Sequence, residues 1–485
     1  MEVNLADMIS HQARRRSGHP AIVEADAVIT FGELDPLVRR AAAWLMDQGA
    51  RAGDVVGLAL SDSADHLIAH YAVARMGGII LPIDWRWTAD EKRRIAEFFG
   101  AALVLVETVG ELANGVAVDA SWRDQLSAAD LVREFPTDGD APVVLSLSSG
   151  TTGRPKGPAL SHRQFLARWI TQFVTLTFAE HDRYLNATPL YFGGGRSFSM
   201  SALYAGATVI LFPPPYEPEA LIEAAVRHHA TTTLLVPTLL RRLLEVAGPA
   251  GLAFPSLRLL LSTGAVLHPD ERADVMDRLC PGFINYYGST EGGGVSVLMP
   301  HHPINKASSV GTTVFGVDVE IVDSHGTSVA AGEIGRIRYR GPGISDGFYR
   351  DPKASATSFR DGWFHPGDLG RLDSDGFLYL AGRADDVIIR GGVNIYPAEI
   401  EETLLTHSMV RDVAVIGIPS IDLGEEIVAF VVGAHGADRE SLIAYCRAHL
   451  ALYKVPKSIE FIDELPKTSL GKVVKSDLSS RSRRD

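Results

Sequence analysis

Short apolar runs alternate with longer helical stretches, and this alternation restricts the fold more than any other feature of the chain. The runs are Val55–Leu60, Gly78–Pro82, Val143–Leu147, Thr208–Phe212, Thr232–Val236 and Leu259–Ser262. Apolar strands without polar alternation are typical of parallel sheets that helices bury on both faces. Such sheets bind ligands where loops leave the carboxyl ends of their strands. The sequence therefore predicts an α/β fold with its site at those ends.

The pattern changes after about Val310, which indicates further structural units. The later strands and helices are expected at Val317–Val322, Gly335–Tyr339, Val413–Ile416 and Ile427–Val432, with helices from Pro397 and from about Glu440. A chain of 485 residues, 46% of them hydrophobic, can build several cores. We predict a large N-terminal α/β domain (residues 1–384) with two doubly wound sheets and a small β section. A mobile α+β C-terminal domain (residues 385–485) follows.

Composition excludes some classes of function. The formal net charge is −13, and the one basic cluster is Arg481, Arg483 and Arg484. Nucleic-acid binding requires a basic face, so it is disfavoured. Cys280 and Cys446 cannot build a disulfide framework, which favours a reducing compartment. The chain has neither a signal-peptide pattern nor an apolar run of the ~18 residues that a transmembrane helix needs. We expect a cytoplasmic protein.

The strongest local motif is Ser148–Gly157, which follows the predicted strand Val143–Leu147. Its glycines free backbone amides to approach an anion, its hydroxyls add donors, and Lys156 adds positive charge. It is not a Walker A loop, because Lys156 is followed by Gly157 and is not preceded by glycine. A polar surface turn is the alternative, but this density of donors after a buried strand favours a triphosphate site.

Five motifs in sequence order resemble the adenylate-forming enzymes, the superfamily of acyl-CoA synthetases, peptide-synthetase adenylation domains and firefly-type luciferases. They are Ser148–Gly157, Asn285–Glu291, Gly362–Gly370, Gly382–Glu401 and Pro466–Lys472, and Phe31–Asp35 resembles the opening helix of the family. The resemblance covers nearly the whole chain. It implies that ATP and a carboxylic acid form an acyl-AMP, and that a thiol then takes the acyl group.

The resemblance also implies a nucleotide site. Its ATP and AMP contacts would be Ser149, Gly150, Thr151, Thr152, Lys156, Gly264, Tyr287, Thr290, Asp368, Arg383 and Lys472. Tyr287 offers a flat ring for adenine, and Asp368 can accept hydrogen bonds from the ribose hydroxyls. Glu291 would hold Mg²⁺, which prefers carboxylate oxygens. Lys472, Thr290 and Glu291 would be the catalytic residues, because a placed cation stabilises the charge that builds up on phosphorus.

The resemblance places the remaining functions as well. A hinge is implied at Asp385, and a CoA channel at Gly391, Gly392 and Arg86. The acyl pocket would be lined by Phe192, Gly193, Gly194, Thr263, Tyr286 and Gly292. These residues suit an aliphatic (fatty) or aromatic acid, and they offer no cation for a second carboxylate, with Arg196 as the one exception. Phe192 replaces the usual histidine of the family, so the substrate preference stays open.

We therefore predict an AMP-forming acyl-CoA synthetase that uses ATP, Mg²⁺ and CoA with a small carboxylic acid; a homodimer is compatible with the sequence. The alternative is an adenylating ligase whose acyl acceptor is an amine or a carrier protein. An amino-acid adenylation domain is disfavoured because no Asp stands in Tyr191–Gly194. Luciferase activity is rare, and a nucleotide-binding pseudoenzyme is disfavoured by the intact Lys472, Glu291 and Asp368.

Two further patterns are interpreted as structural. Gly343–Gly347 fits Gly-x-Ser-x-Gly, but the segment that follows does not begin a helix, so we predict a loop and not a nucleophile elbow. The pairs His228–His229 and His301–His302 lack a third ligand nearby, and neighbouring side chains on one segment point apart. We expect no metal at either pair.

Overall fold

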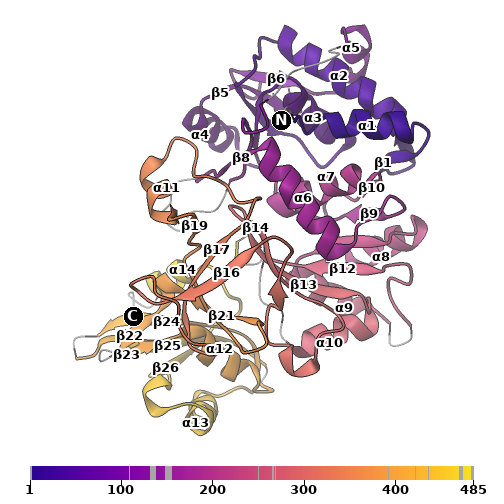
Figure 1. Cartoon of the computed structure of the whole chain (residues 1–485). Helices are drawn as coiled ribbons and strands as arrows, with labels where there is room; N and C mark the ends of the chain where they lie inside the picture. Colours follow the sequence, from indigo (N-terminus) through magenta and orange to yellow (C-terminus); the bar gives the residue numbers. More distant parts are fainter. Residues whose placement is uncertain are drawn as a thin grey trace.

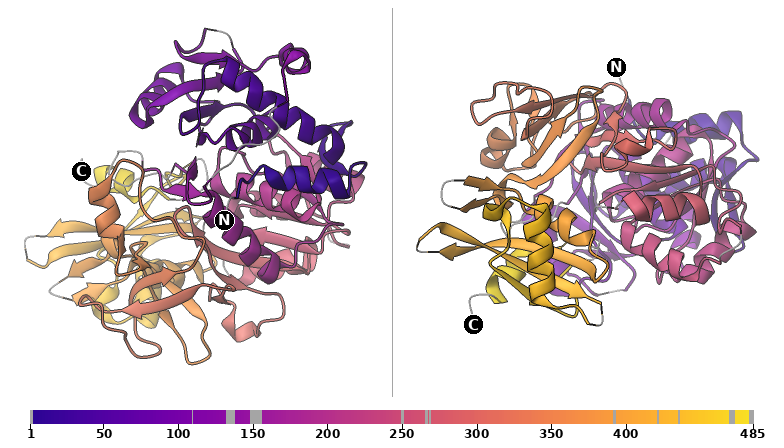
Figure 2. Two further views of the ribbon diagram at one scale, coloured as in Figure 1. Left: turned by 45° about the horizontal axis from the view of Figure 1, so that its top comes forward. Right: turned by 90° about the horizontal axis from the view of Figure 1, so that it is seen from below.

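The computed structural model describes residues 3–108, 110–131, 138–147, 156–248, 251–264, 267, 269–390, 393–420, 422–434, 436–468 and 473–481. The large N-terminal part runs from the indigo elements to the orange ones such as α11 and β17, and the smaller C-terminal part, with β22 to β26 and α12 to α14 in light orange and yellow, lies at the lower left of Figure 1. Seen from below, the small part lies beside the large one (Figure 2). This arrangement confirms the predicted mixed α/β fold.

The largest sheet is mostly parallel. In the described part of the chain its strand order is β15-β14-β13-β12-β11-β9-β10-β1-β2. The strands are β1 (Pro20–Glu24), β2 (Ala27–Thr30), β9 (Arg183–Asn186), β10 (Thr208–Leu211), β11 (Thr232–Leu235), β12 (Leu259–Ser262), β13 (Phe283–Ser289), β14 (Gly293–Leu298) and β15 (Thr312–Thr313). Strands β12 and β13 run parallel, with Ser262 opposite Asn285. The segments that follow Ser262 and Asn285 therefore leave the sheet at the same edge.

A second sheet, also mostly parallel, has the order β6-β5-β3-β4-β7-β8 within the described residues. Its strands are β3 (Val55–Ala59), β4 (Ile79–Pro82), β5 (Ala101–Val106), β6 (Gly115–Ala117), β7 (Pro142–Leu145) and β8 (Ala159–Ser161). Strand β7 leads into Ser148–Gly157, and antiparallel β8 brings the chain back beside it. The predicted phosphate loop therefore connects two neighbouring strands.

Helices cover both large sheets on two faces. They are α1 (Asp7–Arg15), α2 (Phe31–Asp47), α3 (Ala64–Arg75), α4 (Ala89–Phe99), α5 (Trp122–Ala128), α6 (His162–Leu176), α7 (Gly193–Ala205), α8 (Pro218–Arg227), α9 (Pro237–Val246) and α10 (Pro269–Arg278). Alternate residues of β12 enter different cores: Leu259 and Leu261 join one cluster and Leu260 the other. The apolar runs are therefore buried on both faces, as the sequence predicts.

Helix α6 begins directly after β8 because of local capping. The Ser161 side chain accepts a hydrogen bond from the Gln164 amide, and the Gln164 side chain accepts one from the Ser161 amide. Such a capping box satisfies two amide groups that a helix start leaves open. It fixes where the helix leaves the segment that follows the phosphate loop.

The β-rich section forms a third sheet in the order β18-β19-β17-β20-β21, with β16 paired to β17. Its elements are β16 (Asp318–Val322), β17 (Gly335–Arg340), α11 (Pro352–Ser358), β18 (Phe359–Arg360), β19 (Trp363–Phe364), β20 (Asp368–Leu372) and β21 (Leu378–Arg383). A short 3₁₀ turn, Ala384–Asp386, then leads to the next sheet.

The small part has its own sheet and its own core. In the described residues the order is β23-β22-β25-β24, with β26 on β25. The elements are β22 (Ile388–Arg390), β23 (Val393–Ile395), α12 (Pro397–Leu405), β24 (Val410–Ser420), β25 (Gly424–Gly433), α13 (Arg439–His449), β26 (Ser458–Phe461) and α14 (Lys475–Arg481). Residues of this part alone make up its main core cluster, which is the hallmark of a domain.

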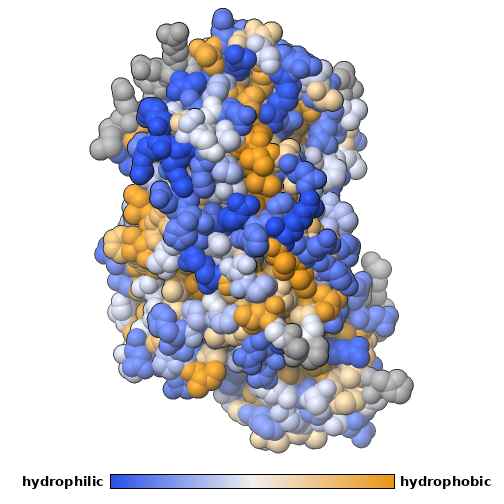
Figure 3. Space-filling view, turned by 90° about the vertical axis from the view of Figure 1, so that its right-hand side faces the viewer, coloured by the Kyte–Doolittle hydropathy of each residue, from blue (hydrophilic) through white to orange (hydrophobic). Residues whose placement is uncertain are grey.

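No helix among the described residues is long and apolar enough to cross a membrane. On the face that Figure 3 shows, apolar side chains lie among hydrophilic ones.

Candidate active site

Tyr287, Asp368 and Arg383 meet, although they lie far apart in the sequence. The Tyr287 hydroxyl donates to Asp368 Oδ2 at 2.6 Å, and Arg383 Nη1 donates to Asp368 Oδ1 at 2.8 Å. Asp368 and Arg383 are cross-strand partners at adjoining ends of β20 and β21. Burial and the Asp368 carboxylate raise the pKa of Tyr287 well above its usual value. The structure thus brings together the Tyr287 ring, which is predicted to stack on adenine, and the two predicted ribose contacts.

Thr290 and Glu291 form the turn between β13 and β14, and their backbone is held from outside the sheet. Arg168 of α6 donates to the Thr290 carbonyl at 3.2 Å and to the Glu291 carbonyl at 2.6 Å. The Ser345 amide donates to the same Glu291 carbonyl at 2.9 Å. The predicted phosphate and magnesium residues therefore sit on a tightly bonded turn.

The Glu291 carboxylate suits a magnesium ion that a substrate helps to hold. The described residues contain no cluster of three or more His, Cys, Asp or Glu side chains that could hold a metal by themselves. Mg²⁺ commonly takes one or two carboxylates and completes its shell with substrate phosphates and water. Glu291 would supply the carboxylate of such a site, and the phosphates of the substrate would supply further oxygens.

The residues predicted to line the acyl pocket lie at the start of α7 and around the ends of β12 and β13. A Cβ atom added to Gly193 or to Gly264 would meet no heavy atom within 4 Å, so there is open space at both positions. Gly264, which is a predicted nucleotide contact and not an acyl-pocket residue, has φ +94°, which favours glycine. The Phe192 ring folds over Gly194, and the Tyr286 ring packs edge-on against Phe198 of α7 at 5.7 Å. Thr263 and Gly292 adjoin these groups in the chain.

Arg196 is engaged inside the protein. Its side chain donates to the Leu190 and Tyr191 carbonyls and to the Ser146 hydroxyl, and the residue is only 2% exposed. Burial lowers the pKa of Arg196 to about 9. Because both Nη atoms already bind neutral protein groups and the residue is buried, the guanidinium is a poor counterion for a second substrate carboxylate.

Arg86 lies beside the same region. It forms an ion pair with Asp84 at 2.7 Å, and Arg86 Nη2 donates to the Tyr191 hydroxyl at 2.8 Å. Its side chain is 43% exposed, so a solvent-borne anion can reach it. This exposed position beside Tyr191 is compatible with the predicted contact to CoA.

Other predicted residues fall elsewhere. Lys156 lies with its ammonium group 5.5 Å from the Phe348 ring, and Asp385 lies in the turn between the third sheet and the small domain. Seven predicted residues lie outside the described residues: Ser149, Gly150, Thr151, Thr152, Gly391, Gly392 and Lys472.

Gly343–Gly347 is a loop, as predicted from the sequence. The Ser345 hydroxyl is buried and donates to the Ala159 and Gly347 carbonyls. It therefore ties this loop to β8 and does not stand exposed like a nucleophile.

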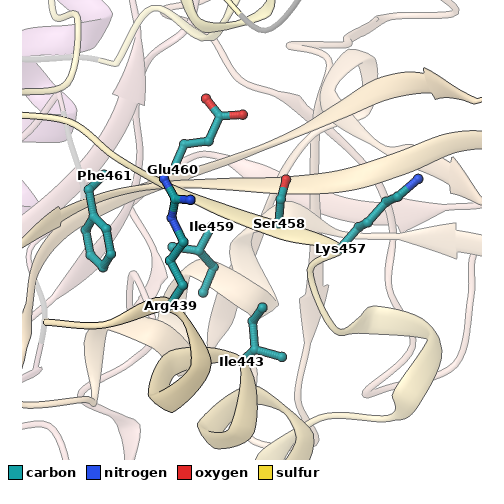
Figure 4. Close-up of a pocket in the computed structure, with 7 residues that line it drawn as sticks. All are labelled: Arg439, Ile443, Lys457, Ser458, Ile459, Glu460 and Phe461. Carbon is teal, nitrogen blue, oxygen red and sulfur yellow. The ribbon is translucent and has the colours of Figure 1, made fainter. Parts of the chain in front are cut away.

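A separate hollow of about 550 Å³ lies in the small domain (Figure 4). Helix α13 and strand β26 line it, through Arg439, Ile443, Lys457, Ser458, Ile459, Glu460 and Phe461. None of these residues belongs to the nucleotide or acyl sites. The hydrogen-bonded groups of the predicted nucleotide site, Tyr287, Asp368 and Arg383, lie instead in the large domain.

Sequence reasoning missed Arg168. The residue is buried within α6, and its partners lie more than a hundred positions away in the chain. A lone arginine in an amphipathic helix gives no sign of such partners, so only the fold reveals its role.

Comparison with known proteins identifies the family. Residues 9–349 match the AMP-binding enzyme family, and residues 399–472 match the AMP-binding enzyme C-terminal domain. The feruloyl-CoA synthase of Amycolatopsis sp is 34% identical over 97% of both chains, and the indoleacetate–CoA ligase of Aromatoleum aromaticum is 32% identical over 98% of both. The ATP-bound structure of MatB from Rhodopseudomonas palustris has a TM-score of 0.91 and 28% identity, covering 100% of this chain and 99% of that one.

The family match spans most of the chain, and the relatives share nearly its full length. The chain therefore belongs to the AMP-binding enzyme family, within the adenylate-forming superfamily.

Proposed function

We propose that this acyl-CoA synthetase activates an aromatic monocarboxylic acid with ATP and transfers the acyl group to CoA. The observation that carries the proposal is near-full-length similarity to two CoA ligases whose names specify aromatic acids. The joined Tyr287, Asp368 and Arg383 support an intact nucleotide site.

The pocket chemistry favours an uncharged aromatic group. Phe192, Tyr286 and Phe198 supply rings, and aromatic pairs prefer edge-on or offset contacts. The open space at Gly193 leaves room for a planar substrate at the start of α7. Arg196 is committed to the protein interior, which argues against a dicarboxylic acid.

The nucleotide residues take the roles that their chemistry suits. Tyr287 stacks on adenine, Asp368 and Arg383 bind the ribose, and Thr290 contacts the α-phosphate. Magnesium at Glu291 would neutralise charge on the triphosphate. Lys472 approaches the carboxylate and the α-phosphate during adenylation and stabilises the charge of the transition state.

The second half-reaction uses a rotation of the small domain about Asp385. The third sheet ends at Arg383 and the sheet of the small domain begins at Ile388, so the connection is short. Gly391, Gly392 and Arg86 then guide the pantetheine arm and the phosphates of CoA.

The test is an ATP–pyrophosphate exchange screen without CoA, over aromatic, aliphatic and dicarboxylic acids. Aromatic monocarboxylic acids should give the highest exchange. Preference for a fatty or a dicarboxylic acid would overturn the substrate assignment and leave adenylation intact.

A second assay tests the acceptor, with mass spectrometry of products from the best acid, ATP and either CoA or simple amines. Acyl-CoA should dominate. An amide that forms faster than the thioester would move the protein to the alternative class of adenylating ligases.

A further inference from the structure

One buried arginine links three segments that the proposed reaction needs. Arg168 is 9% exposed, and its side chain donates to backbone carbonyls of Gly343, Thr290 and Glu291. The bond from Nε to Gly343 is 2.7 Å long and the bond from Nη2 to Glu291 is 2.6 Å long. All of these acceptors are neutral, so the guanidinium serves geometry more than charge pairing.

The same loop also reaches the segment after the predicted phosphate loop. The Tyr349 amide donates to the Gly157 carbonyl at 2.8 Å, and the Ala159 amide donates to the Gly347 carbonyl at 3.1 Å. Gln164, one turn before Arg168 on α6, donates to Asp346 at 2.9 Å. The Thr290–Glu291 turn and the exit of the phosphate loop are therefore bonded to one intermediate loop.

We propose that Arg168 is a positioning residue that holds the Thr290–Glu291 turn in register with the exit of the phosphate loop at Gly157, so that Mg²⁺–ATP binds productively. The proposal rests on the proposed function and adds a residue that touches no reacting atom. A planar guanidinium fits several carbonyls in fixed directions, which a lysine ammonium cannot reproduce. Small misplacement of a phosphate-binding group reduces the rate steeply.

Gly343 offers a second way to disturb the same contact. A Cβ atom there would lie 2.7 Å from Arg168 Cγ, which is the base of the side chain and not its flexible end. Gly343→Ala should therefore displace the Arg168 stem while the guanidinium stays present. The two variants damage one arrangement by different means.

A matched control exists in α10. Arg272 is 5% exposed and donates to the Met299 carbonyl, and burial lowers its pKa as it does for Arg168. Arg272→Lys removes a comparable buried guanidinium outside the Thr290–Glu291 turn. It reports what the loss of a structural arginine does by itself.

The experiment measures pyrophosphate exchange against Mg²⁺ concentration, together with melting temperature, for Arg168→Lys, Gly343→Ala and Arg272→Lys. We expect exchange to fall at least tenfold in the first two variants, with half-saturation by Mg²⁺ shifted several-fold upward. Thioester formation from supplied acyl-AMP, which needs no Mg²⁺ at Glu291 but keeps the Thr290 contact, should fall several-fold less than exchange does. Arg272→Lys should change melting temperature alone.

Calorimetry separates this inference from the proposed function. Affinity for ATP is measured with and without Mg²⁺, and affinity for AMP serves as the reference. Arg168→Lys should lose most of the Mg²⁺-dependent gain in ATP affinity and keep AMP binding, whether or not any acid is turned over. The positioning role would be overturned if Arg168→Lys kept the full Mg²⁺-dependent gain in ATP affinity, or if its gain equalled that of Arg272→Lys.

Discussion

The Tyr287 hydroxyl holds the carboxylate that we assign to the ribose. A hydrogen bond to a charged group contributes about 1.5–3 kcal/mol. Tyr287→Phe removes the 2.6 Å bond to Asp368 and keeps the ring, so it should raise the KM for ATP by about tenfold, as ~1.4 kcal/mol would. Steady-state kinetics with varied ATP measure the effect. Tyr379→Phe is the control, because Tyr379 bonds Asp373 in a similar way; an equal rise there would refute the assignment.

Lys472 carries the chemical step in our proposal. Lys472→Ala should reduce acyl-AMP formation by ~10² or more, which is typical of losing a contact to transition-state charge. Thioester formation from supplied acyl-AMP should survive, because the small domain has turned Lys472 away by then. Rapid-quench assays of each half-reaction measure the effects on acyl-AMP formation and on thioester formation separately. The control Lys467→Ala, which breaks an ion pair with Asp412, should leave both half-reactions unchanged. Equal losses of Lys472→Ala in both half-reactions would refute the catalytic role of Lys472.

The residues that the sequence could reveal are those inside contiguous motifs. Asp368 and Arg383 stand in such motifs, and their pairing follows from one β-hairpin register. Arg168 and Tyr339 could not be found this way. Tyr339 is fully buried and bonds the Ser289 hydroxyl at 2.7 Å, but in the sequence it is one aromatic residue of a strand.

Among the elements, the turn Ala384–Asp386 joins two independently formed sheets. Proline at position 385 fixes φ and so restricts rotation there. Asp385→Pro should leave pyrophosphate exchange nearly unchanged and slow thioester formation at least tenfold. Single-turnover measurements of each step provide the test, and Asp385→Ala, which keeps backbone freedom, is the control. Normal rates in the proline variant would place the hinge elsewhere.

Local periodicity predicted the existence of elements better than their pairing. Helix α12 begins at Pro397 as expected, and β12 matches its apolar run. Strand β24 is longer than its apolar centre, because pairing with β25 extends it at both ends. The pairing of β1 with β10 could not be predicted from the local sequence, because long-range packing and not composition selects that neighbour.

The whole molecule keeps three histidines uncharged in its interior. His66 and His70 lie in α3 and His162 begins α6, and each is 1% exposed. Burial lowers the pKa of His66 and of His162 to about 4, and lowers the pKa of His70 well below its usual value. Asp62 acts in the opposite sense, because burial raises its pKa to about 6.

These four groups contribute to the way in which stability depends on pH. Below pH ~6.5, which is the ordinary histidine pKa, the unfolded chain binds three protons at these histidines that the folded chain does not bind. The contribution of the three histidines to the free energy of unfolding is therefore present above that pH and is lost as the pH falls toward ~4. Between ~4 and ~6 the folded chain instead keeps one proton on Asp62, which offsets a third of the effect. These four groups together contribute a difference of about two protons, which lowers the free energy of unfolding by roughly 2.7 kcal/mol per pH unit near pH 5. Urea titrations at pH 7, 6 and 5 measure this slope.

His162→Asn keeps an acceptor for the Leu5 amide but does not titrate, so the slope should drop by about one proton, ~1.4 kcal/mol per pH unit. The same replacement at exposed His325 should leave the slope unaltered, and equal slopes in all three proteins would show that the buried histidines do not control acid stability.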